Sequence, residues 1–193
     1  MSIDGVVFSS QHCEKRNSPR GTDTKMKHLF SPWRSAYIKT FNERRHTSGC
    51  LFCRILKGKG KKADTTNLIV WRGKFCFVVM NRYPYNSGHL LIVPYRHISS
   101  FVKLSPEEHS EIMIATGNCI QALEHLSKPQ GFNFGANLGR TAGAGIDKHV
   151  HFHLVPRWNG DTNFMPVLSD VKLISENMNT LRAKLSQKLN MVK

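Results

Sequence analysis

The segment His149-Val150-His151-Phe152-His153-Leu154-Val155 has a histidine at every second position, with apolar residues between and after them. Successive side chains of an extended chain point to opposite faces. This alternation therefore predicts a β-strand with three imidazoles on one face and Val150, Phe152 and Leu154 buried on the other. Histidine titrates close to neutral pH, which suits it to act as nucleophile, proton donor or metal ligand. The segment predicts a catalytic or metal-binding strand rather than a solvated polar face.

Four further apolar runs predict the strands that accompany this segment. They are bounded by Gly, Pro and Asn, which are typical of turns, and the first two are separated by Arg72-Gly73, which suits a hairpin. We expect strands at Leu68 to Trp71, Phe75 to Met80, His89 to Val93 and Phe132 to Asn137, and at Lys148 to Val155 for the histidine segment.

Two helices complete the predicted domain. Ser105-Pro106-Glu107-Glu108 is a helix start, in which the serine and the second glutamate satisfy free backbone donors. The apolar spacing that follows predicts a core face formed by Ile112, Thr116, Cys119, Leu123 and Leu126. A C-terminal amphipathic helix, capped by Ser169, is predicted from Val171, Ile174, Met178, Leu181, Leu185 and Leu189. These elements predict an α+β domain, an antiparallel β-sheet with packed helices.

Length and composition fit one domain preceded by an arm. Hydrophobic residues make up 40% of the 193 residues, as in globular proteins, and no apolar run reaches the roughly 18 residues that span a membrane. Residues 1–28 lack the features of a secretory signal and are predicted to form a disordered basic arm. Five cysteines, an odd number without a signal, indicate a reducing, cytoplasmic location rather than a disulfide framework.

The chain is strongly basic, with a formal net charge of +15. Such a charge favours anionic partners but does not choose among nucleotides, nucleic acids and acidic membranes. Part of the excess lies in the lysine-rich segment from Lys57 to Lys62, which we expect to be a solvated loop.

Two more motifs carry chemistry. Cys50-Leu51-Phe52-Cys53 has the spacing of two thiolates on one zinc ion, whose other ligands must come from distant residues, or of a redox pair. The loop from Gly139 to Gly145 is rich in small residues, which let backbone N–H groups approach a phosphate closely but are equally typical of a flexible turn.

The histidine segment and Pro156-Arg157 together resemble the motif of the histidine triad family of nucleotide hydrolases and transferases. Two further segments are similar to members of this family. The family's nucleoside-binding loop and following strand resemble Asn81-Arg82-Tyr83-Pro84 with Ser87-Gly88-His89-Leu90, and the next motif along the chain resembles Val93-Pro94-Tyr95-Arg96-His97-Ile98. The resemblance covers about residues 30 to 190 and implies a single catalytic domain of this fold over residues 29–193.

Further segments resemble the branch of the family that phosphorolyses diadenosine tetraphosphate. They are Ser31-Pro32-Trp33-Arg34, Gly143-Ala144-Gly145-Ile146 and the stretch from Pro156 to Met165. Family hydrolases usually carry a Gln followed by Ser or Thr where this chain has Ala144-Gly145. The departure removes a side-chain donor to the bridging phosphate and favours phosphorolysis over hydrolysis.

The resemblance also implies roles for individual residues. His151 becomes the nucleophile that forms a nucleotidyl-histidine, and His153 contacts a phosphate oxygen or the leaving group. The resemblance gives His89 a hydrogen bond that orders the active-site loop. The substrate-binding residues that it implies are Asn81, Asn137, Gly143, Ala144, Gly145 and Trp158.

In zinc-containing members of the family, the metal ligands correspond to Cys50, Cys53, His97 and His149. All four positions of the tetrahedron are then filled by protein, so the zinc is structural and activates no water. It ties the Cys50–Cys53 motif to the histidine strand.

The sequence therefore predicts a nucleotidyl transferase of dinucleoside polyphosphates that converts diadenosine tetraphosphate to ATP and ADP, with inorganic phosphate as acceptor. The family resemblance also implies a homodimer. A hydrolase of the same substrates or of nucleoside phosphoramidates is the first alternative. A zinc-stabilised nucleic-acid-binding protein is the second, but it leaves the triad unexplained, and residues 56–67 lack the aromatic side chains on which bases stack. Neither a membrane nor a nucleic acid is the expected partner.

Overall fold

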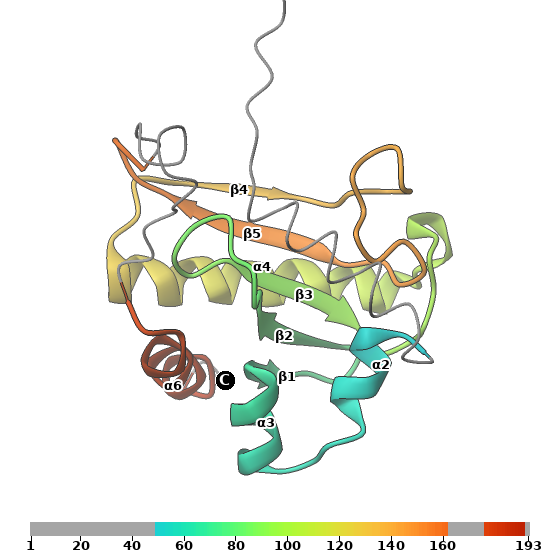
Figure 1. Ribbon diagram of the computed structural model, residues 1–193, viewed down its shortest axis with the longest axis horizontal. Coiled ribbons are helices and arrows are strands. Elements are labelled where there is room, and N and C mark those ends of the chain that lie inside the picture. Colours follow the sequence, from blue (N-terminus) through green and yellow to red (C-terminus); the bar gives the residue numbers. More distant parts are fainter. Residues whose placement is uncertain (1–48, 162–175, 192–193) are drawn as a thin grey trace, which may run out of the picture.

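The structure, a computed structural model, describes residues 49–161 and 176–191 (Figure 1). The predicted arm, residues 1–28, lies outside these ranges, as do residues 29–48 of the predicted domain. None of the helices within the described ranges is long and apolar enough to cross a membrane.

The architecture is an antiparallel sheet packed against helices, so the predicted α+β class is confirmed (Figure 1). Five strands follow one another across the sheet in the order β1-β2-β3-β5-β4, and every neighbouring pair is antiparallel. The strands are β1 (Ile69–Arg72), β2 (Cys76–Met80), β3 (Leu90–Pro94), β4 (Gly131–Gly135) and β5 (Phe152–Arg157). Every residue of β2 and β3 is buried, because both faces of the central sheet are covered.

The histidine strand starts later than predicted. The prediction placed its start at Lys148, but β5 begins at Phe152, which pairs with Ile92 of β3. His149 and His151 therefore precede the ladder. The chain departs from it here because the Val150 N–H donates to the carbonyl of Ile98, beyond the end of β3. Similarly, β4 ends at Gly135 rather than at Asn137.

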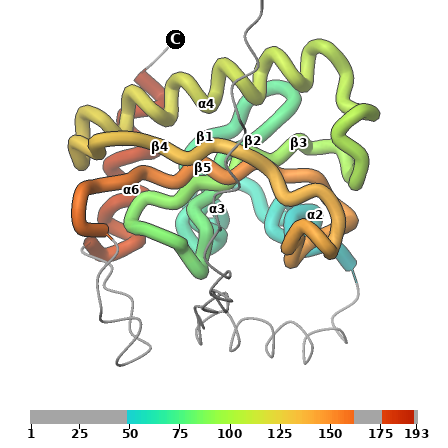
Figure 2. The backbone as a smooth tube through the Cα atoms, turned by 90° about the horizontal axis from the view of Figure 1, so that it is seen from above, coloured from blue at the N-terminus to red at the C-terminus, as the bar shows by residue number. Residues whose placement is uncertain are grey.

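The long helix α4 (Pro106–Ser127) covers one face of the sheet (Figure 2). Its predicted start is confirmed. The Ser105 side chain accepts a hydrogen bond from the Glu108 N–H, and the Glu108 carboxylate accepts one from the Ser105 N–H. The predicted core face is buried at Ile112, Thr116, Cys119 and Leu123, while Leu126 packs against the core from a partly buried position.

The other helices are α2 (Leu51–Leu56), α3 (Lys61–Asn67) and α6 (Met178–Leu189), with a 3-10 turn at Phe101–Lys103. Helix α6 packs against α4 and β1. Its cap is Asn177 rather than the predicted Ser169, because the Asn177 side chain accepts hydrogen bonds from two N–H groups of the first turn. Ser169, with Val171 and Ile174, lies outside the described residues. The segment from Lys57 to Lys62 is solvated as predicted, but its end is the first turn of α3 rather than loop.

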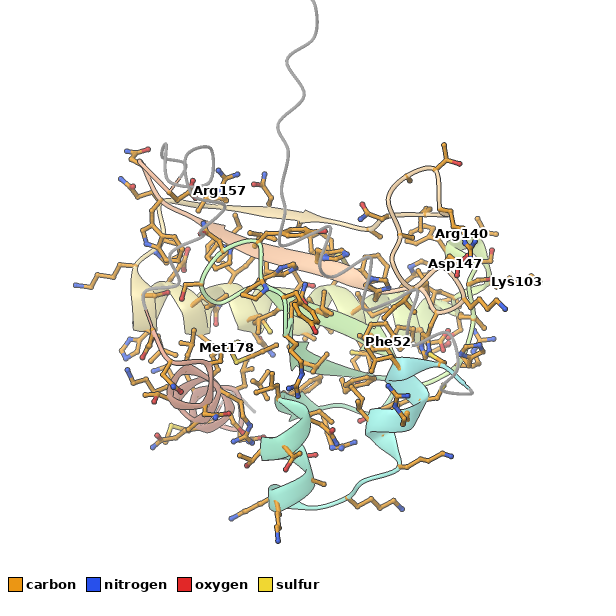
Figure 3. All side chains as sticks on the ribbon, viewed as in Figure 1. Phe52, Lys103, Arg140, Asp147, Arg157 and Met178 are labelled. Atoms are coloured by element: carbon orange, nitrogen blue, oxygen red, sulfur yellow. The ribbon has the colours of Figure 1, made fainter. Side chains whose placement is uncertain are left out.

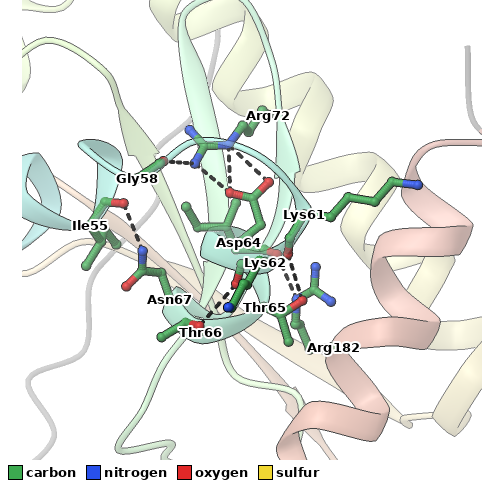
Figure 4. A network of polar contacts seen from close by, with 11 residues as sticks. Ile55, Gly58, Lys61, Lys62, Asp64, Thr65, Thr66, Asn67, Arg72 and Arg182 are labelled. Atoms are coloured by element: carbon green, nitrogen blue, oxygen red, sulfur yellow. Dashed lines mark hydrogen bonds and ion pairs between the residues drawn. The ribbon is translucent and has the colours of Figure 1, made fainter.

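Arg72 of β1 holds the α2–α3 segment in place (Figure 4). Its guanidinium donates to the carboxylate of Asp64 on α3, with the nearest atoms 2.6 Å apart, and to the carbonyl of Gly58 between the two helices. The amide of Asn67 donates to the Ile55 carbonyl at the end of α2. These contacts matter for the site, because α2 carries Cys53 and begins directly after Cys50.

Candidate active site and metal centre

The three histidines of the triad occupy different environments. His149 and His151 are buried, 0% and 6% exposed, whereas His153 is partly exposed on β5. The apolar partners Val150, Phe152 and Leu154 are buried, as predicted. The predicted strand face is therefore a graded series of imidazoles, from a buried end at His149 to a more open end at His153.

His151 is held in a single orientation by the main chain. Its Nδ1 atom lies 2.9 Å from the carbonyl oxygen of His149, and because a carbonyl can only accept, Nδ1 carries a proton. Burial lowers the pKa of His151, which keeps the imidazole neutral at pH 7. The Phe52 ring packs on it, with centroids 5.1 Å apart. A neutral imidazole with its proton on Nδ1 has its lone pair on Nε2, the form required of a nucleophile.

His153 contacts residues of the loop that precedes β3. Its Nδ1 atom lies 3.0 Å from Nε2 of His89, and its ring stacks on that of Tyr85 at a centroid distance of 5.8 Å. The ring centroid of His151 lies 5.0 Å from that of His153. Asn81 belongs to the same cluster, since its side-chain amide nitrogen lies 3.2 Å from Nδ1 of His89.

The four residues predicted as metal ligands form one cluster. The potential ligand atoms of Cys50, Cys53, His97 and His149 all lie within 4.8 Å of one another. Nδ1 of His149 is 3.3 Å from Sγ of Cys50, 3.8 Å from Sγ of Cys53 and 3.3 Å from Nδ1 of His97. Sγ of Cys53 is 3.4 Å from Nδ1 of His97.

These separations match a tetrahedral site. Metal–nitrogen bonds of about 2.05 Å and metal–sulfur bonds of about 2.3 Å give tetrahedral edges of about 3.3 Å between two nitrogens and about 3.6 Å between nitrogen and sulfur. The far ring nitrogen of His149 supports this geometry. Its Nε2 lies 3.0 Å from the Pro94 carbonyl, so Nε2 carries the proton and the Nδ1 lone pair faces the cluster. Burial, followed by the neighbouring His97 and His151, lowers the pKa of His149.

The glycine-rich loop between β4 and β5 is folded on itself. The N–H of Gly143 donates to the Arg140 carbonyl at 2.9 Å, and the N–H of Ala144 donates to the Gly139 carbonyl at 3.2 Å. Gly143 has a φ of 87°, which favours glycine because side chains are strained there. The Asn137 amide contacts the Gly143 carbonyl at 3.5 Å. In this conformation the N–H groups of Gly143 and Ala144 serve the turn, so binding a phosphate there requires the loop to rearrange.

A groove of about 420 Å³ opens next to His153. Gly135 pairs directly with His153 across the strands and has no side chain to fill the space beside it. Besides these two residues, the groove is lined by Tyr85, Asn86, Asn133, Phe134, Ala136, Asn137, Val155, Arg157 and Asp161. Arg157 marks one end of β5, and the ion pair between Arg140 and Asp147, 2.7 Å apart, marks the loop at the other (Figure 3).

One wall of the groove is a polar network that the sequence did not suggest as part of the site. The Asp161 carboxylate accepts from Arg157, with the nearest atoms 2.6 Å apart, and from the amide of buried Asn86 at 2.7 Å. Arg157 also donates to the side-chain oxygen of Asn133 at 2.8 Å. The four-residue spacing of Arg157 and Asp161 is the only local signal that the sequence offered for this pair.

Trp158 is placed apart from the histidines. Its indole N–H donates to the Ser127 carbonyl at the end of α4, and it is not among the residues that line the groove. The structure thus brings together His89, His151, His153 and Asn81, with Asn137 and Gly143 in the adjoining loop. Gly145 lies in the same loop as Ala144, between the loop's turn and His149.

Comparisons with known proteins find relatives of one family. The family model described as the HIT domain matches residues 62–160. An AP-4-A phosphorylase of Mycobacterium tuberculosis is 35% identical over 167 residues, 86% of this chain and 86% of that protein. An adenosine 5'-monophosphoramidase of Schizosaccharomyces pombe is 26% identical over 140 residues, 72% of this chain and 98% of that protein.

The fold has solved counterparts. The crystal structure of a zinc-bound histidine triad family protein from Mycobacterium smegmatis matches with a TM-score of 0.58 and 21% identity, over 75% of this chain and 95% of that one. At this identity the likeness concerns the fold.

Proposed function

The chain belongs to the HIT, or histidine triad, family, and from this premise we propose that it is a nucleotidyl transferase acting on dinucleoside polyphosphates. The leading reaction is phosphorolysis of diadenosine tetraphosphate to ATP and ADP. The observation that carries the proposal is the contact of His151 Nδ1 with the His149 carbonyl at 2.9 Å, which leaves the Nε2 lone pair for attack on phosphorus. The phosphorylase relative, 35% identical over most of both chains, supports the choice of reaction.

In the first step, Nε2 of His151 attacks the α-phosphorus of the dinucleotide. A nitrogen–phosphorus bond forms, the bridging oxygen–phosphorus bond breaks, and the electron pair leaves with ATP. In the second step, an oxygen of inorganic phosphate attacks the same phosphorus and releases ADP, and His151 is regenerated. The covalent intermediate divides one difficult displacement into two easier ones.

The surrounding residues bind and orient the phosphates. His153 lies next to His151 and donates to a phosphate oxygen, where positive partial charge stabilises the charge of the transition state. Asn137 and the loop at Gly143, Ala144 and Gly145 complete the phosphate site once the loop opens. The groove beside His153 has room for a nucleoside of the substrate. Asn81 supplies an amide for the ribose, and Trp158 supports the C-terminal end of β5 through its bond to α4.

A hydrolase of the same family is the second candidate, in which water replaces phosphate in the second step. Its support is in the relatives, which include the adenosine 5'-monophosphoramidase. The sequence at Ala144-Gly145 favours the phosphorylase, since it lacks the side-chain donor that family hydrolases carry there. The nucleic-acid-binding alternative is disfavoured, because the relatives with assigned activities are enzymes.

We assign the cluster of Cys50, Cys53, His97 and His149 to a structural zinc ion. Two thiolates and two imidazoles are a usual donor set for zinc, and the spacings fit its tetrahedron. When bound, zinc supplies a cross-link rather than a reactive water, because four protein ligands fill the coordination sphere. The Cys50 and Cys53 thiols need a reducing compartment, which fits the cytoplasm.

A homodimer is the assembly that we propose, formed through the edge of the sheet at β4. Within the described residues, β4 pairs with β5 alone, and Phe134 on it remains 40% exposed. Two copies of the same edge pair by a two-fold axis and cover each other's open backbone groups. Light scattering should give the mass of a dimer for the wild type and for Met191→Glu, an exposed site just beyond the end of α6. It should give a monomer for Phe134→Glu.

The reaction is tested by incubating the protein with diadenosine tetraphosphate, with and without isotopically labelled inorganic phosphate. We expect ATP and ADP only when phosphate is present, with the label in the β-phosphate of ADP, and no products from His151→Ala. AMP and ATP formed without phosphate would identify a hydrolase. No turnover of this or any other nucleotide would reject both candidates.

A further inference from the structure

The groove beside His153 follows one face of strands β4 and β5, which lie side by side (Figure 1). Alternate residues of β5, from His153 to Arg157, form this face, because side chains alternate along a strand. Their direct partners on β4 are Gly135, Asn133 and Gly131. On this face, β4 therefore has one side chain between two glycines.

The two glycines leave the floor of the groove bare. A Cβ atom on Gly135 or on Gly131 would meet no atom within 4 Å in the described part of the chain outside its own neighbours. Neither glycine has a positive φ, so neither packing nor backbone conformation requires glycine there. Glycine weakens a strand, and inside one it often marks a place where a ligand approaches the backbone closely. The bare floor therefore indicates a site where a ligand lies against the strands.

Arg157 is held in place at the far end of the groove. Its Nε and Nη2 atoms donate to the two carboxylate oxygens of Asp161 at 2.6 and 2.9 Å, and its Nη1 donates to the side-chain oxygen of Asn133 at 2.8 Å. The amide of buried Asn86 holds Asp161 in turn. The side chain of Asp161 is 9% exposed and that of Arg157 is 44% exposed. This wall therefore presents guanidinium nitrogens rather than carboxylate oxygens.

The exposed atoms of the wall are hydrogen-bond donors. Because arginine can only donate, the oxygen of Asn133 faces Arg157 and its NH₂ group faces away. That NH₂ group has no partner among residues 49–161 and 176–191. The carboxylate of Asp161 neutralises the guanidinium, so the wall suits a neutral group with two neighbouring acceptors better than an anion. Guanine has such a pair in O6 and N7, whereas adenine has a donor at N6 beside N7.

The wall is too far from the catalytic histidines to act on the reacting phosphorus. His153 and Arg157 are four residues apart on β5, which is about 13 Å at the usual rise of a strand. Asn81, which we assign to a ribose, lines a separate small pocket and not this groove. The groove therefore lies where the other half of a dinucleotide extends beyond His153.

We propose that this groove is the subsite for the leaving nucleotide and that it prefers guanine to adenine. The phosphates and ribose of the leaving half pass over Gly135, and its base accepts hydrogen bonds from Asn133 and Arg157. The preferred substrate is then a mixed dinucleoside tetraphosphate, with adenosine at the attacked end and guanosine at the leaving end. The direction of the substrate rests on the proposed function, whereas the match between the donors and guanine is testable by binding alone.

The products formed from adenosine-guanosine tetraphosphate report which base lies in the groove. Phosphorolysis gives ADP and GTP when the guanosine half leaves, and GDP and ATP when the adenosine half leaves. We expect about a tenfold excess or more of ADP and GTP, since a good pair of hydrogen bonds to a base edge discriminates by about that factor. If water replaces phosphate, AMP with GTP against GMP with ATP reports the same choice. Equal amounts of the two product pairs, or an excess of the pair that contains ATP, would overturn the proposal.

Two substitutions of Asn133 assign the preference to the wall. Asn133→Ala removes one donor and should reduce the product ratio several-fold. In Asn133→Asp a carboxylate replaces the NH₂ donor and can accept from N6 of adenine, so the ratio should move further toward GDP and ATP. A product ratio that is the same in the wild type and in both variants would contradict the role of this residue.

Gly135→Val tests the path through the groove. A β-branched side chain suits a strand and meets no protein atom here, so the melting temperature should not fall, but KM should rise at least about tenfold because the leaving half loses its contacts. Gly117→Val is the matched control, at an exposed glycine of α4 where a Cβ also meets nothing, and its KM should be unchanged. An unchanged KM in Gly135→Val would refute the assignment.

Calorimetric titration decides if the protein turns over no dinucleotide. GTP should bind to the wild type more tightly than ATP, and Gly135→Val should abolish the difference. Equal affinities for GTP and ATP in the wild type, or a difference that persists in Gly135→Val, would overturn the proposal independently of the reaction.

Discussion

The Nδ1 atom of His149 lies 3.3 Å from the Sγ atom of Cys50, although 99 residues separate the two along the chain. The contact joins the start of α2 to the residues that immediately precede β5. His149 is also two residues from His151, whose Nδ1 donates to the His149 carbonyl. A metal ion bound by this cluster would therefore hold the peptide group that orients the proposed nucleophile.

Replacing Cys50 should remove the metal and weaken both the fold and the reaction. We expect Cys50→Ser to lose bound zinc, measured by elemental analysis of the purified protein, and to unfold at a lower temperature. The rate of nucleotide turnover should fall because the His149 carbonyl is no longer anchored. A coordinating thiolate supplies strong binding that a serine hydroxyl does not replace.

Cys119→Ala is the matched control for that experiment. Cys119 lies on the core face of α4, away from the cluster. Its replacement should cost stability through a small cavity but leave the zinc content unchanged. Full zinc content in Cys50→Ser would contradict the assigned ligands.

Thiol reagents should separate the cysteines by chemistry and burial. Burial raises the pKa of the Cys119 thiol to about 12, and burial followed by the neighbouring Glu111 raises that of Cys76. Almost no thiolate then exists at pH 8 to react. In protein carrying Cys13→Ser, we expect no rapid labelling before chelation of the metal, and labelling of Cys50 and Cys53 after it. Fast labelling of Cys119 in the folded protein, seen by mass spectrometry, would refute this.

Glu108 should make the stability of the protein depend on pH. Glu108 is 5% exposed, and its carboxylate contacts Arg96 at 2.6 Å and accepts from the Ser105 N–H. The hydrogen bond from Arg96, opposed by burial, holds the pKa of Glu108 below its ordinary value of 4.5. A lowered folded-state pKa stabilises the fold above pH 4.5, and this contribution is lost as the pH falls through the folded-state pKa.

Glu108→Gln should therefore lower the free energy of unfolding by about 1–2 kcal/mol at pH 7, and by progressively less as the pH falls below 4.5. Chemical denaturation at several pH values measures the difference. Glu124→Gln, an exposed site on the same helix, is the control and should change stability little at any pH. A difference for Glu108→Gln that stays constant from pH 7 to pH 3 would contradict the explanation.

Much of the fold was predictable because local patterns and burial agreed. The capping box at Ser105 and Glu108 fixes the start of α4, and the apolar alternation around Phe152 fixes which residues of the histidine segment are buried. The start of β5 was not predictable. Alternation continues through His149 and Val150, but the Ile98 carbonyl, rather than a neighbouring strand, accepts the hydrogen bond of Val150.

The sequence indicated which residues form the site better than it indicated the contacts between them. The spacing of Cys50 and Cys53 indicates two ligands, and only the fold can bring His97 and His149 to them. The sequence did not predict helix α3, because glycines and lysines dominate the segment that leads into it. The ion pair of Asp64 with Arg72 of β1, which only the fold reveals, stabilises the helix. No local pattern shows that Asn86 and Asp161, 75 residues apart, share a hydrogen bond.

The role of His151 as the nucleophile is tested most directly by detecting the covalent nucleotidyl intermediate. The wild-type protein, mixed with diadenosine tetraphosphate in the absence of phosphate and quenched under conditions that preserve phosphorus–nitrogen bonds, is digested and analysed by mass spectrometry. We predict one adenylyl group on the peptide that contains His151, its loss when phosphate is added together with the appearance of ADP, and its absence in His151→Ala. An adenylyl group on another residue, or phosphate-dependent turnover that persists in His151→Ala, would contradict the assignment of His151 as the nucleophile.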